Sequence, residues 1–564
     1  MTEKSTLNAQ SWLSDAYDST TRLAVQKLID TKGEDLIESF YKDLDFGTGG
    51  MRGIMGVGSN RINKYTIGKA TQGLANTLIE MYPNDDISVA IAYDCRNNSD
   101  FLAQVSADVL SANGIKVFLF SALRPTPELS FAVRELSCKS GIVITASHNP
   151  KEYNGYKVYG NDGCQIVNPF DVELIKKVRA LSIEDVNFNK QEDLISTLGE
   201  EFDTLYINRI KTLSLSPNAI KEHNNLPIVF TGIHGTGAVM VPKTLKAFGF
   251  TNVLTVASQD IIDGNFPTVK SPNPEEPAAL ELAINLAKEK GAKLVMGTDP
   301  DADRVGIAIP DKSGEFILLN GNQTGSLLIN YLVTRWKELG KISGKEFIAK
   351  TVVTTDLMDK IALNNGVKVY NTLTGFKHIG AVIRALEGKE QFIGGGEESY
   401  GYLAGDFVRD KDAVMSCVLI AEMVAWALSN GKDLFDLMQD MYLEHGFYLE
   451  DLISITKQGR HGAAEIKTIM DNLRKNTPNL IVGEKVVKFI DYLETDKTNL
   501  PQSNVLQFIT DKGTKITARP SGTEPKIKFY FSVQHHLQSN SDFYKVKDKL
   551  QRKIIEIQNE MSLI

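Results

Sequence analysis

The strongest chemical signal in the sequence is a run that ends in a polar loop containing a serine. Residues 141–150 read Gly-Ile-Val-Ile-Thr-Ala-Ser-His-Asn-Pro. Valine, isoleucine and threonine favour an extended strand, and Pro150 has no N–H to prolong it. We therefore expect Ser147 to lie in a loop at the carboxyl end of a strand, where open parallel sheets hold their reactive groups. A serine hydroxyl in such a loop can act as a nucleophile or carry a phosphoryl group.

His148 is the neighbour that could activate this serine. Adjacent side chains in an extended chain point in opposite directions, so we expect His148 to be poorly placed for that role. A Ser-His-Asn-Pro run in isolation is also typical of a polar turn without chemistry. The rest of the chain must decide between the two interpretations.

Three aspartates alternate in a second loop. Residues 297–304 read Gly-Thr-Asp-Pro-Asp-Ala-Asp-Arg. In extended backbone, alternate side chains share one side, so Asp299, Asp301 and Asp303 can converge on a cation. Ligation by oxygen alone is typical of Mg²⁺ or another hard divalent ion, and the spacing does not fit an EF-hand. The alternative is a solvated acidic turn, in which the three carboxylates would repel one another.

A third loop, residues 519–526, reads Arg-Pro-Ser-Gly-Thr-Glu-Pro-Lys. It offers a guanidinium, two hydroxyls and backbone amides, which suit a phosphate dianion. A tight hairpin turn is the alternative. The candidate phosphate ligands are Arg519, Ser521, Gly522 and Thr523.

Two weaker signals complete the set. Glu397 and Ser399, in the glycine-rich loop 394–401, could bridge sugar hydroxyls, because a carboxylate accepts hydrogen bonds and a hydroxyl both donates and accepts. Residues 46–53, Phe-Gly-Thr-Gly-Gly-Met-Arg-Gly, could bring backbone amides and Arg52 close to an anion. A plain turn is the alternative for the second loop.

The apolar patterns indicate how these loops are positioned. A helical segment over residues 1–40 precedes strands at 87–93, 115–120 and 141–145 with helices between them, which is typical of a parallel sheet. The pattern returns with strands at 228–230, 253–256 and 293–296, and again at 347–353, 367–370 and 391–393. Beyond residue 445, helices and strands indicate a smaller α+β domain. We expect the polar loops to share one site.

Composition limits the class of protein. The 564 residues are 42% hydrophobic and carry a formal net charge of −8, which argues against nucleic acid held by a general basic surface. The four cysteines show no zinc-binding spacing and are expected to be reduced thiols. The N-terminus has no signal-peptide pattern, and no stretch approaches about 18 apolar residues. We expect a cytoplasmic protein with no membrane or nucleic-acid partner.

Taken together, T-A-S-H-N-P, D-P-D-A-D-R, G-E-E-S and R-P-S-G-T-E-P resemble the α-D-phosphohexomutase superfamily, which includes phosphoglucomutases and phosphomannomutases. The resemblance covers nearly the whole chain. Residues 46–53, 93–99 and 374–380 are most similar to the phosphoglucomutase/phosphopentomutase branch. The resemblance implies four domains around a central cleft. We place them at residues 1–205, 206–320, 321–445 and 446–564. The first three are expected to be similar α/β domains with mixed, largely parallel sheets, and the last is expected to be a smaller α+β domain.

The resemblance also implies roles for the loops. Ser147 would be a phosphoserine, and Mg²⁺ would be bound by the three aspartates and a phosphoserine oxygen. Arg304 would lie beside the reacting phosphoryl group. Arg52 would supply further positive charge to the pocket. Lys157 matches a lysine proposed for proton transfer in the family. Lys377 and His378 are the next candidates for this role. Glu397 and Ser399 match the residues that contact the sugar hydroxyls. The residues that match the clamp for the distal phosphate are Arg519, Ser521, Gly522 and Thr523.

One departure concerns the proton-transfer group. Some members carry histidines in the two sugar loops, whereas these positions are occupied here by Phe376 and Gly401. The identity of the general base therefore stays open.

The resemblance implies an isomerase of carbohydrate metabolism. It would interconvert hexose 1-phosphate and hexose 6-phosphate, with glucose favoured, through a phosphoserine enzyme and glucose 1,6-bisphosphate as intermediate and activator. A phosphomannomutase or phosphopentomutase with the same mechanism is the close alternative. A hydrolase using the same serine, and an inert phosphosugar sensor, are the others. We expect a monomer or weak homodimer.

Overall fold

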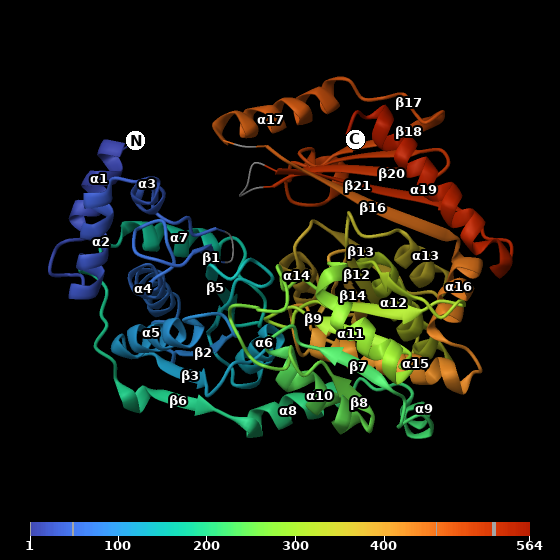
Figure 1. Cartoon of the computed structure of the whole chain (residues 1–564), viewed down its shortest axis with the longest axis horizontal. Coiled ribbons are helices and arrows are strands. Elements are labelled where there is room, and N and C mark those ends of the chain that lie inside the picture. The colour runs from blue at the N-terminus through green and yellow to red at the C-terminus, as the bar shows by residue number, and fades with distance from the viewer. Residues whose placement is uncertain (1, 48–49, 458, 522–525, 564) are drawn as a thin grey trace. The chain divides into compact units, whose positions relative to one another are not determined.

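A computed structural model describes residues 2–47, 50–457, 459–521 and 526–563 (Figure 1). The chain divides into two compact units. The first comprises Met1–Leu319, Ile383–Ala385 and Gly401–Ser429; the second comprises Asn320–Val382, Leu386–Tyr400 and Asn430–Ile564.

The first unit begins with the expected helical segment. A cluster of aromatic rings holds it to the next helix, with Trp12 stacked on Tyr17 at a centroid distance of 4.5 Å and edge-on to Tyr65. The Tyr65 hydroxyl donates to the Asp18 carboxylate at 2.7 Å, and Asp18 caps the second helix. The helices are α1 (Thr2–Ser11), α2 (Ser19–Thr31), α3 (Glu34–Phe40) and α4 (Lys64–Met81).

The first sheet has the strand order β1-β5-β4-β2-β3-β6. Strands β2, β3, β4 and β6 are parallel, and β5 runs antiparallel to both β4 and the edge strand β1. The strands are β1 (Gly50–Ile54), β2 (Ser88–Tyr93), β3 (Lys116–Phe120), β4 (Ser140–Ile144), β5 (Tyr153–Gly160) and β6 (Ile195–Leu198). The helices after α4 are α5 (Ser99–Ala112), α6 (Thr126–Glu135), α7 (Phe170–Ala180) and the short η1 (Glu192–Leu194).

The strand order positions the serine loop. Because β3 and β4 lie on either side of β2, the direction of the crossover connections reverses at β2. Right-handed crossovers then place α5 and α6 on opposite faces of the sheet, an arrangement for which a crevice at the carboxyl ends of β2 and β4 is expected. Ligands of open α/β sheets bind in such a crevice.

The second sheet repeats this arrangement, with the order β11-β10-β9-β7-β8 and β7 between β8 and β9. Here β10 is the reversed strand, and it pairs antiparallel with both β9 and β11. The strands are β7 (Ile228–Thr231), β8 (Val253–Thr255), β9 (Leu294–Thr298), β10 (Val305–Pro310) and β11 (Phe316–Leu319). The helices are α8 (Glu200–Lys211), α9 (Pro217–Glu222), α10 (Gly237–Phe248) and α11 (Pro277–Lys290).

A later segment of the chain completes the first unit. It consists of β15 (Gly401–Ala404) and α15 (Ala413–Ser429), and α15 packs against α9 and α10. This burial explains why α15 is apolar on nearly all sides. No single helix in the described part of the chain is long and apolar enough to cross a membrane.

The second unit contains a third parallel set in which β12 lies between β13 and β14. The strands are β12 (Glu346–Thr351), β13 (Lys368–Thr372) and β14 (Gln391–Glu397). The helices are α12 (Gly321–Glu338), α13 (Leu357–Asn364), α14 (Phe376–Leu386) and α16 (Leu434–His445).

The rest of the second unit is an antiparallel sheet in the order β16-β21-β20-β19-β18-β17, with α19 packed on β16 and β21. The strands are β16 (Phe447–Thr456), β17 (Leu480–Ile481), β18 (Glu484–Asp491), β19 (Leu506–Thr510), β20 (Lys515–Pro520) and β21 (Lys526–His535). The helices are α17 (Gly459–Lys475), α18 (Thr495–Thr498), η2 (Asn540–Asp542) and α19 (Phe543–Glu560).

The predicted fold class is confirmed: three α/β domains with mixed sheets are followed by an α+β domain. Each sheet lies within one of the four predicted segments, and the boundaries at 205, 320 and 445 stay predictions.

Candidate active site

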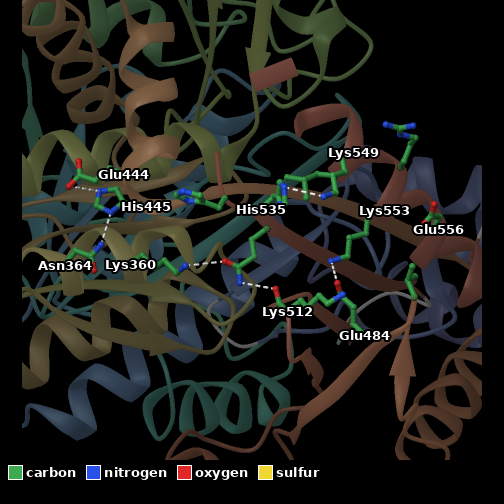
Figure 2. Close-up of a pocket in the computed structure, with 16 residues that line it drawn as sticks. Lys360, Asn364, Glu444, His445, Glu484, Lys512, His535, Lys549, Lys553 and Glu556 are labelled. Carbon is green, nitrogen blue, oxygen red and sulfur yellow. Dashed lines mark hydrogen bonds and ion pairs between the residues drawn. The ribbon is translucent and has the colours of Figure 1, made fainter. Parts of the chain in front are cut away.

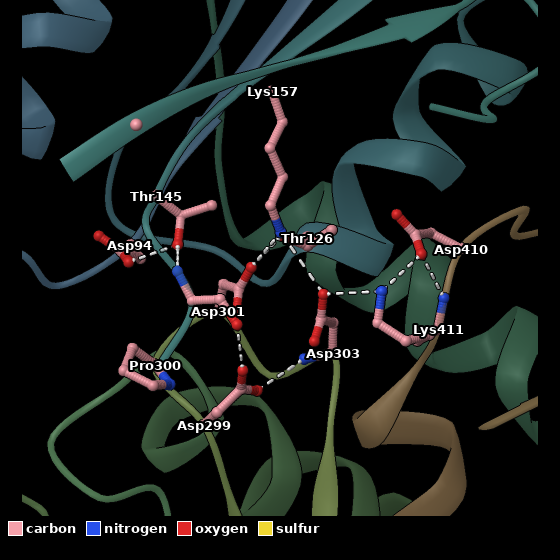
Figure 3. Close-up of polar contacts among 12 residues, drawn as sticks. Asp94, Thr126, Thr145, Lys157, Asp299, Pro300, Asp301, Asp303, Asp410 and Lys411 are labelled. Carbon is pink, nitrogen blue, oxygen red and sulfur yellow. Dashed lines mark hydrogen bonds and ion pairs between the residues drawn. The ribbon is translucent and has the colours of Figure 1, made fainter. Parts of the chain in front are cut away.

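Ser147 lies three residues beyond the end of β4, in the loop that the sequence predicts. Its amide donates to Thr145 Oγ1 at 2.8 Å, and the Thr145 hydroxyl donates to Asp94 Oδ2 at 2.6 Å. Asp94 directly follows β2, so these bonds join the carboxyl ends of β2 and β4 (Figure 3).

A buried arginine fixes the rest of the serine loop. Arg96 lies 3.3 Å from the Asp94 carboxylate, and both side chains are fully buried. Its guanidinium donates, at 2.5 to 3.0 Å, to the backbone carbonyls of Ser147, Asn149, Pro150 and Tyr153. Sequence reasoning missed this role for Asp94 and Arg96, although their position directly after an apolar strand was a usable signal.

The prediction that His148 points away from Ser147 is wrong. Ser147 has a φ of 53°, so the backbone is left-handed there and both side chains turn to one side. Ser147 Oγ lies 3.2 Å from His148 Nδ1. Burial and the guanidiniums of Arg304 and Arg52 hold the pKa of His148 well below its ordinary value, which keeps the imidazole neutral.

The three aspartates converge as predicted at the carboxyl end of β9 (Figure 3). All three are buried, and one carboxylate oxygen from each lies within 4.8 Å of the others. The Ser147 hydroxyl donates to Asp299 Oδ2 at 2.8 Å. Among the described residues, Oδ1 of Asp301 and Oδ1 of Asp303 have no hydrogen-bond partner. Buried, unsatisfied carboxylate oxygens beside a third carboxylate fit a hard divalent cation.

The loop after β7 supports the aspartate loop. Thr236 donates to the Pro300 carbonyl from both its amide and its hydroxyl, each at 2.9 Å. A Cβ at Gly235 would lie 2.5 Å from Pro300 Cα, so only glycine allows this approach. Thr126, at the start of α6, donates to Asp301 Oδ2 at 2.9 Å.

Two lysines offset the negative charge of the triad. Lys157 Nζ lies 2.7 Å from Asp301 Oδ2 and 3.5 Å from Asp303 Oδ2. Lys411 Nζ lies 3.1 Å from Asp303 Oδ2 and 3.0 Å from Asp410 Oδ1 (Figure 3). Sequence reasoning missed Lys411, which follows β15 in the charged run Arg-Asp-Lys-Asp at 409–412.

The carboxylates differ in proton affinity. Burial, together with the charges of Asp301 and Asp303, raises the pKa of Asp299 well above its ordinary value. Burial alone would also raise the pKa of Asp301, but the ammonium of Lys157 outweighs it and lowers that pKa. The two lysines therefore offset part of the negative charge of the triad.

Lys411 also explains the glycine at position 401, where some family members have histidine. A Cβ at Gly401 would lie 2.1 Å from Lys411 Cδ. The lysine therefore takes the space that a side chain at position 401 would need.

Two arginines complete the site in the first unit. Arg52 donates to Asn149 Oδ1 at 2.8 Å, so it lies against the serine loop. Arg304 pairs with Glu275 at 2.7 Å, and its Nε is 3.8 Å from Asp303 Oδ1.

The predicted sugar and phosphate loops lie in the second unit. Glu397 ends β14 and accepts a hydrogen bond from the Gly375 amide at 2.8 Å. Burial, Lys377 and Arg519 lower the pKa of His378 to about 4, so these cations lie near one neutral imidazole. Ser399 follows Glu397 by two residues, Ser521 directly follows β20 and its amide donates to the Lys526 carbonyl, and Gly522 and Thr523 lie outside the described residues.

A serine beside a buried carboxylate triad that could hold a metal ion, in loops of two open α/β sheets, is typical of a phosphoryl-transfer enzyme. Three family models match the chain: phosphoglucomutase/phosphomannomutase alpha/beta/alpha domain I at residues 43–183, domain II at 204–314 and domain III at 320–444. The chain belongs to this family, the α-D-phosphohexomutase superfamily, and is a phosphosugar mutase of the isomerase class.

Individual relatives support this family assignment. The phosphoglucomutase of Staphylococcus haemolyticus strain JCSC1435 is 40% identical over 525 residues, which cover 90% of this chain and 94% of the relative. That of Staphylococcus aureus strain N315 is 38% identical over 543 residues, covering 94% and 96%. A solved phosphoglucomutase/phosphomannomutase family protein of Burkholderia thailandensis, 21% identical, has the same fold, with a TM-score of 0.64 over 90% of this chain and 96% of that one.

Proposed function

We propose that this protein is a phosphoglucomutase that interconverts glucose 1-phosphate and glucose 6-phosphate, with phospho-Ser147 as the phosphoryl carrier. The observation that carries the proposal is the 2.8 Å hydrogen bond from Ser147 Oγ to Asp299, inside a buried triad that has two unsatisfied oxygens. A serine serving only as a turn residue would have no reason to lie there.

In the forward direction the bond between phosphorus and Ser147 Oγ breaks, and a new bond forms between phosphorus and the free hydroxyl of the hexose 1-phosphate. The proton of that hydroxyl passes to a base, and Ser147 Oγ takes up a proton as its bond to phosphorus breaks. The resulting glucose 1,6-bisphosphate then returns its other phosphoryl group to Ser147 Oγ. The same groups serve both steps, since the second is the reverse of the first with the sugar turned around.

We propose that Asp299, Asp301 and Asp303 hold Mg²⁺ together with an oxygen of phospho-Ser147. The bound ion would stabilise negative charge on the transferring phosphoryl oxygens. Arg304 and Arg52 approach the same loops and supply further positive charge. Arg96 and Thr145 orient the serine, because they fix its loop by backbone hydrogen bonds.

Two groups are candidates for moving the hydroxyl proton. Lys157 is near the triad, but its contact with Asp301 and Asp303 raises its pKa despite burial, which makes the free amine scarce. His148 is neutral and lies 3.2 Å from Ser147 Oγ. We assign proton transfer at the serine oxygen to His148. We assign proton transfer from the sugar hydroxyl to Lys157, whose amine would become available once its contact with Asp301 is lost.

Substrate recognition is proposed for residues of the second unit. Phosphate contacts are assigned to Arg519 and Ser521 of the described residues, and to Gly522 and Thr523 by resemblance. Sugar contacts are assigned to Lys377, His378, Glu397 and Ser399. Both ends of the substrate must fit the same phosphate contacts, so these hydroxyl contacts must select the sugar.

A coupled assay for glucose 6-phosphate, with inorganic phosphate measured in parallel, tests the proposal. Mutase activity without stoichiometric phosphate release is expected. Release of phosphate would indicate the hydrolase, and neither product would indicate a sensor. A kcat/KM for mannose 1-phosphate or ribose 1-phosphate more than about tenfold above that for glucose 1-phosphate would contradict the choice of sugar.

The remaining assignments follow from the proposed chemistry. The partner is a small phosphosugar rather than nucleic acid or membrane, and glucose 1,6-bisphosphate acts as activator. The proposed location is the cytoplasm, and the proposed state is a monomer or weak homodimer, which sedimentation would establish.

A further inference from the structure

A cavity of about 1070 Å³ lies in the second unit among residues that have no part in the proposed reaction (Figure 2). Six segments line it: α13, the end of α16, the turn between β17 and β18, the turn between β19 and β20, the end of β21, and α19. Ligand pockets typically enclose about 300–1,000 Å³, so the cavity has room for a whole small metabolite.

The lining of the cavity is basic, although the chain carries a net charge of −8. The lining contains five cationic side chains and three carboxylates, so its formal net charge is +2. The cations are Lys360, Lys512, Lys549, Arg552 and Lys553, and the carboxylates are Glu444, Glu484 and Glu556.

Most of these cations have no carboxylate partner. Lys553 pairs with Glu484 at 2.6 Å, but no described carboxylate lies within 4.0 Å of the charged nitrogens of the other four. Lys549 Nζ instead lies 3.3 Å from His535 Nε2, and Lys360 donates to the Gln534 amide oxygen at 3.4 Å (Figure 2). Such like charges around one cavity repel one another, and an anion between them would remove that repulsion.

A buried histidine adds an unpaired donor. The His445 side chain is 1% exposed, and the Asn364 amide nitrogen lies 3.1 Å from its Nδ1 (Figure 2). An amide nitrogen only donates, so Nδ1 accepts and the hydrogen is on Nε2. Nε2 has no hydrogen-bond partner, the Glu444 carboxylate being 3.7 Å away. A buried N–H in this position lacks an acceptor.

We propose that this cavity binds a small metabolite carrying two or more phosphate groups. Phosphate oxygens accept hydrogen bonds without donating, and each group brings nearly two negative charges, which match the unpaired lysines, Arg552 and His445 Nε2. One phosphate group would not span cations on α13, on α19 and in the turn between β19 and β20, whereas two groups on one molecule would. The site is separate from the Arg519 loop, no residue of which lines the cavity.

The site also joins two parts of the second unit. Lys360 and His445 come from α13 and α16, whereas Lys512, Lys549 and Arg552 come from the C-terminal sheet and α19. Gly446, which lines the cavity between them, has a φ of 97°, a value that favours glycine. A ligand held by both sides would therefore stiffen the connection to the domain that carries Arg519.

The test is calorimetric titration of the full chain with inorganic pyrophosphate, in the presence of saturating glucose 1-phosphate and Mg²⁺. The double variant Lys512→Ala/Lys549→Ala removes two exposed charges from the cavity and should weaken binding at least about tenfold. The control Lys488→Ala/Lys545→Ala removes two exposed charges outside the cavity and should bind as the wild type does. Arg519→Ala should also bind normally.

Three results would overturn the proposal: no binding to the wild type at millimolar pyrophosphate, equal weakening in the two double variants, or loss of binding in Arg519→Ala alone. The last would place the anion in the substrate site. Failure of the mutase proposal would leave these binding measurements unaffected, because none of them reads turnover.

Discussion

At the scale of single residues, the site balances three buried carboxylates with one lysine from β5 and one from the segment between β15 and α15. Lys157 contacts Asp301 and Asp303, and Lys411 contacts the same Oδ2 of Asp303 (Figure 3). Without them the carboxylates would repel both one another and a phosphorylated substrate. Each lysine therefore has an electrostatic role that can be tested without changing a proposed metal ligand.

We predict that Lys411→Met lowers kcat/KM at least about tenfold, because it removes a charge 3.1 Å from Asp303. Gly401→Ala should have a similar effect, since its Cβ would displace the lysine side chain. The effects should not add in the double variant, because both remove the same contact. Additive losses, or full activity of Gly401→Ala, would show that Lys411 does not act through this position.

A second residue-scale prediction concerns the metal. Asp301→Asn removes one of three converging charges, so the Mg²⁺ concentration for half-maximal activity should rise at least about tenfold. Activity of the wild type should disappear in excess chelator and return with Mg²⁺. Turnover that persists in the dialysed, chelator-treated protein would reject a metal role for the triad.

At the scale of elements, the same strand order occurs three times: β2, β7 and β12 each lie between the next two parallel strands of their sheets. The proposed functional loop follows the third strand each time, with Ser147 after β4, Asp299 after β9 and Glu397 at the end of β14. This repetition was predictable from apolar runs ending in polar, glycine-bearing loops. The supporting contacts were not, because they join residues far apart in sequence.

We predict that Gly235→Ala raises the Mg²⁺ concentration needed for activity without changing any carboxylate. Its Cβ would meet the Pro300 backbone, so the aspartate loop must shift. The matched control is Gly199→Ala, where a Cβ meets nothing within 4 Å. Titration of activity with Mg²⁺ should show at least about a tenfold higher requirement for Gly235→Ala only. Equal requirements in the two variants would remove the supporting role of the loop after β7.

At the scale of the whole molecule, the sequence predicted the class of each sheet and the loops that carry chemistry. It failed where local rules do not hold. The left-handed φ of Ser147 turned His148 toward the serine, against the extended geometry assumed for that loop. The position of Arg96 after an apolar strand was a usable signal, but the partners of Arg96 and Lys411 lie far away in sequence and could not be predicted. Similarly, α15 follows the third sheet in sequence yet packs in the first unit.

Stability should depend on pH through Asp412, which is fully buried and accepts hydrogen bonds from the Tyr206 hydroxyl at 2.7 Å and the Met415 amide at 2.8 Å. Burial raises its pKa from 3.8 to about 6. The folded state therefore binds this proton more tightly than the unfolded chain does, so the contribution is fully present below pH 3.8 and is lost as pH rises through about 6.

This shift corresponds to roughly 3 kcal/mol. Relative to Asp412→Asn, the free energy of unfolding of the wild type should thus fall by about that amount between pH 4 and pH 7. Urea unfolding followed by tryptophan fluorescence at both pH values measures it. A difference between the two proteins that does not change with pH would contradict the assignment.

The central claim is that Ser147 carries the phosphoryl group. The most direct measurement is peptide mapping by mass spectrometry after incubation with glucose 1,6-bisphosphate and Mg²⁺, alongside turnover of Ser147→Ala. The account predicts one phosphate on the peptide containing Ser147, none on the variant, and no turnover by the variant, which should remain folded because the change removes little packing. Phosphate on another residue, or near-normal turnover by Ser147→Ala, would contradict it.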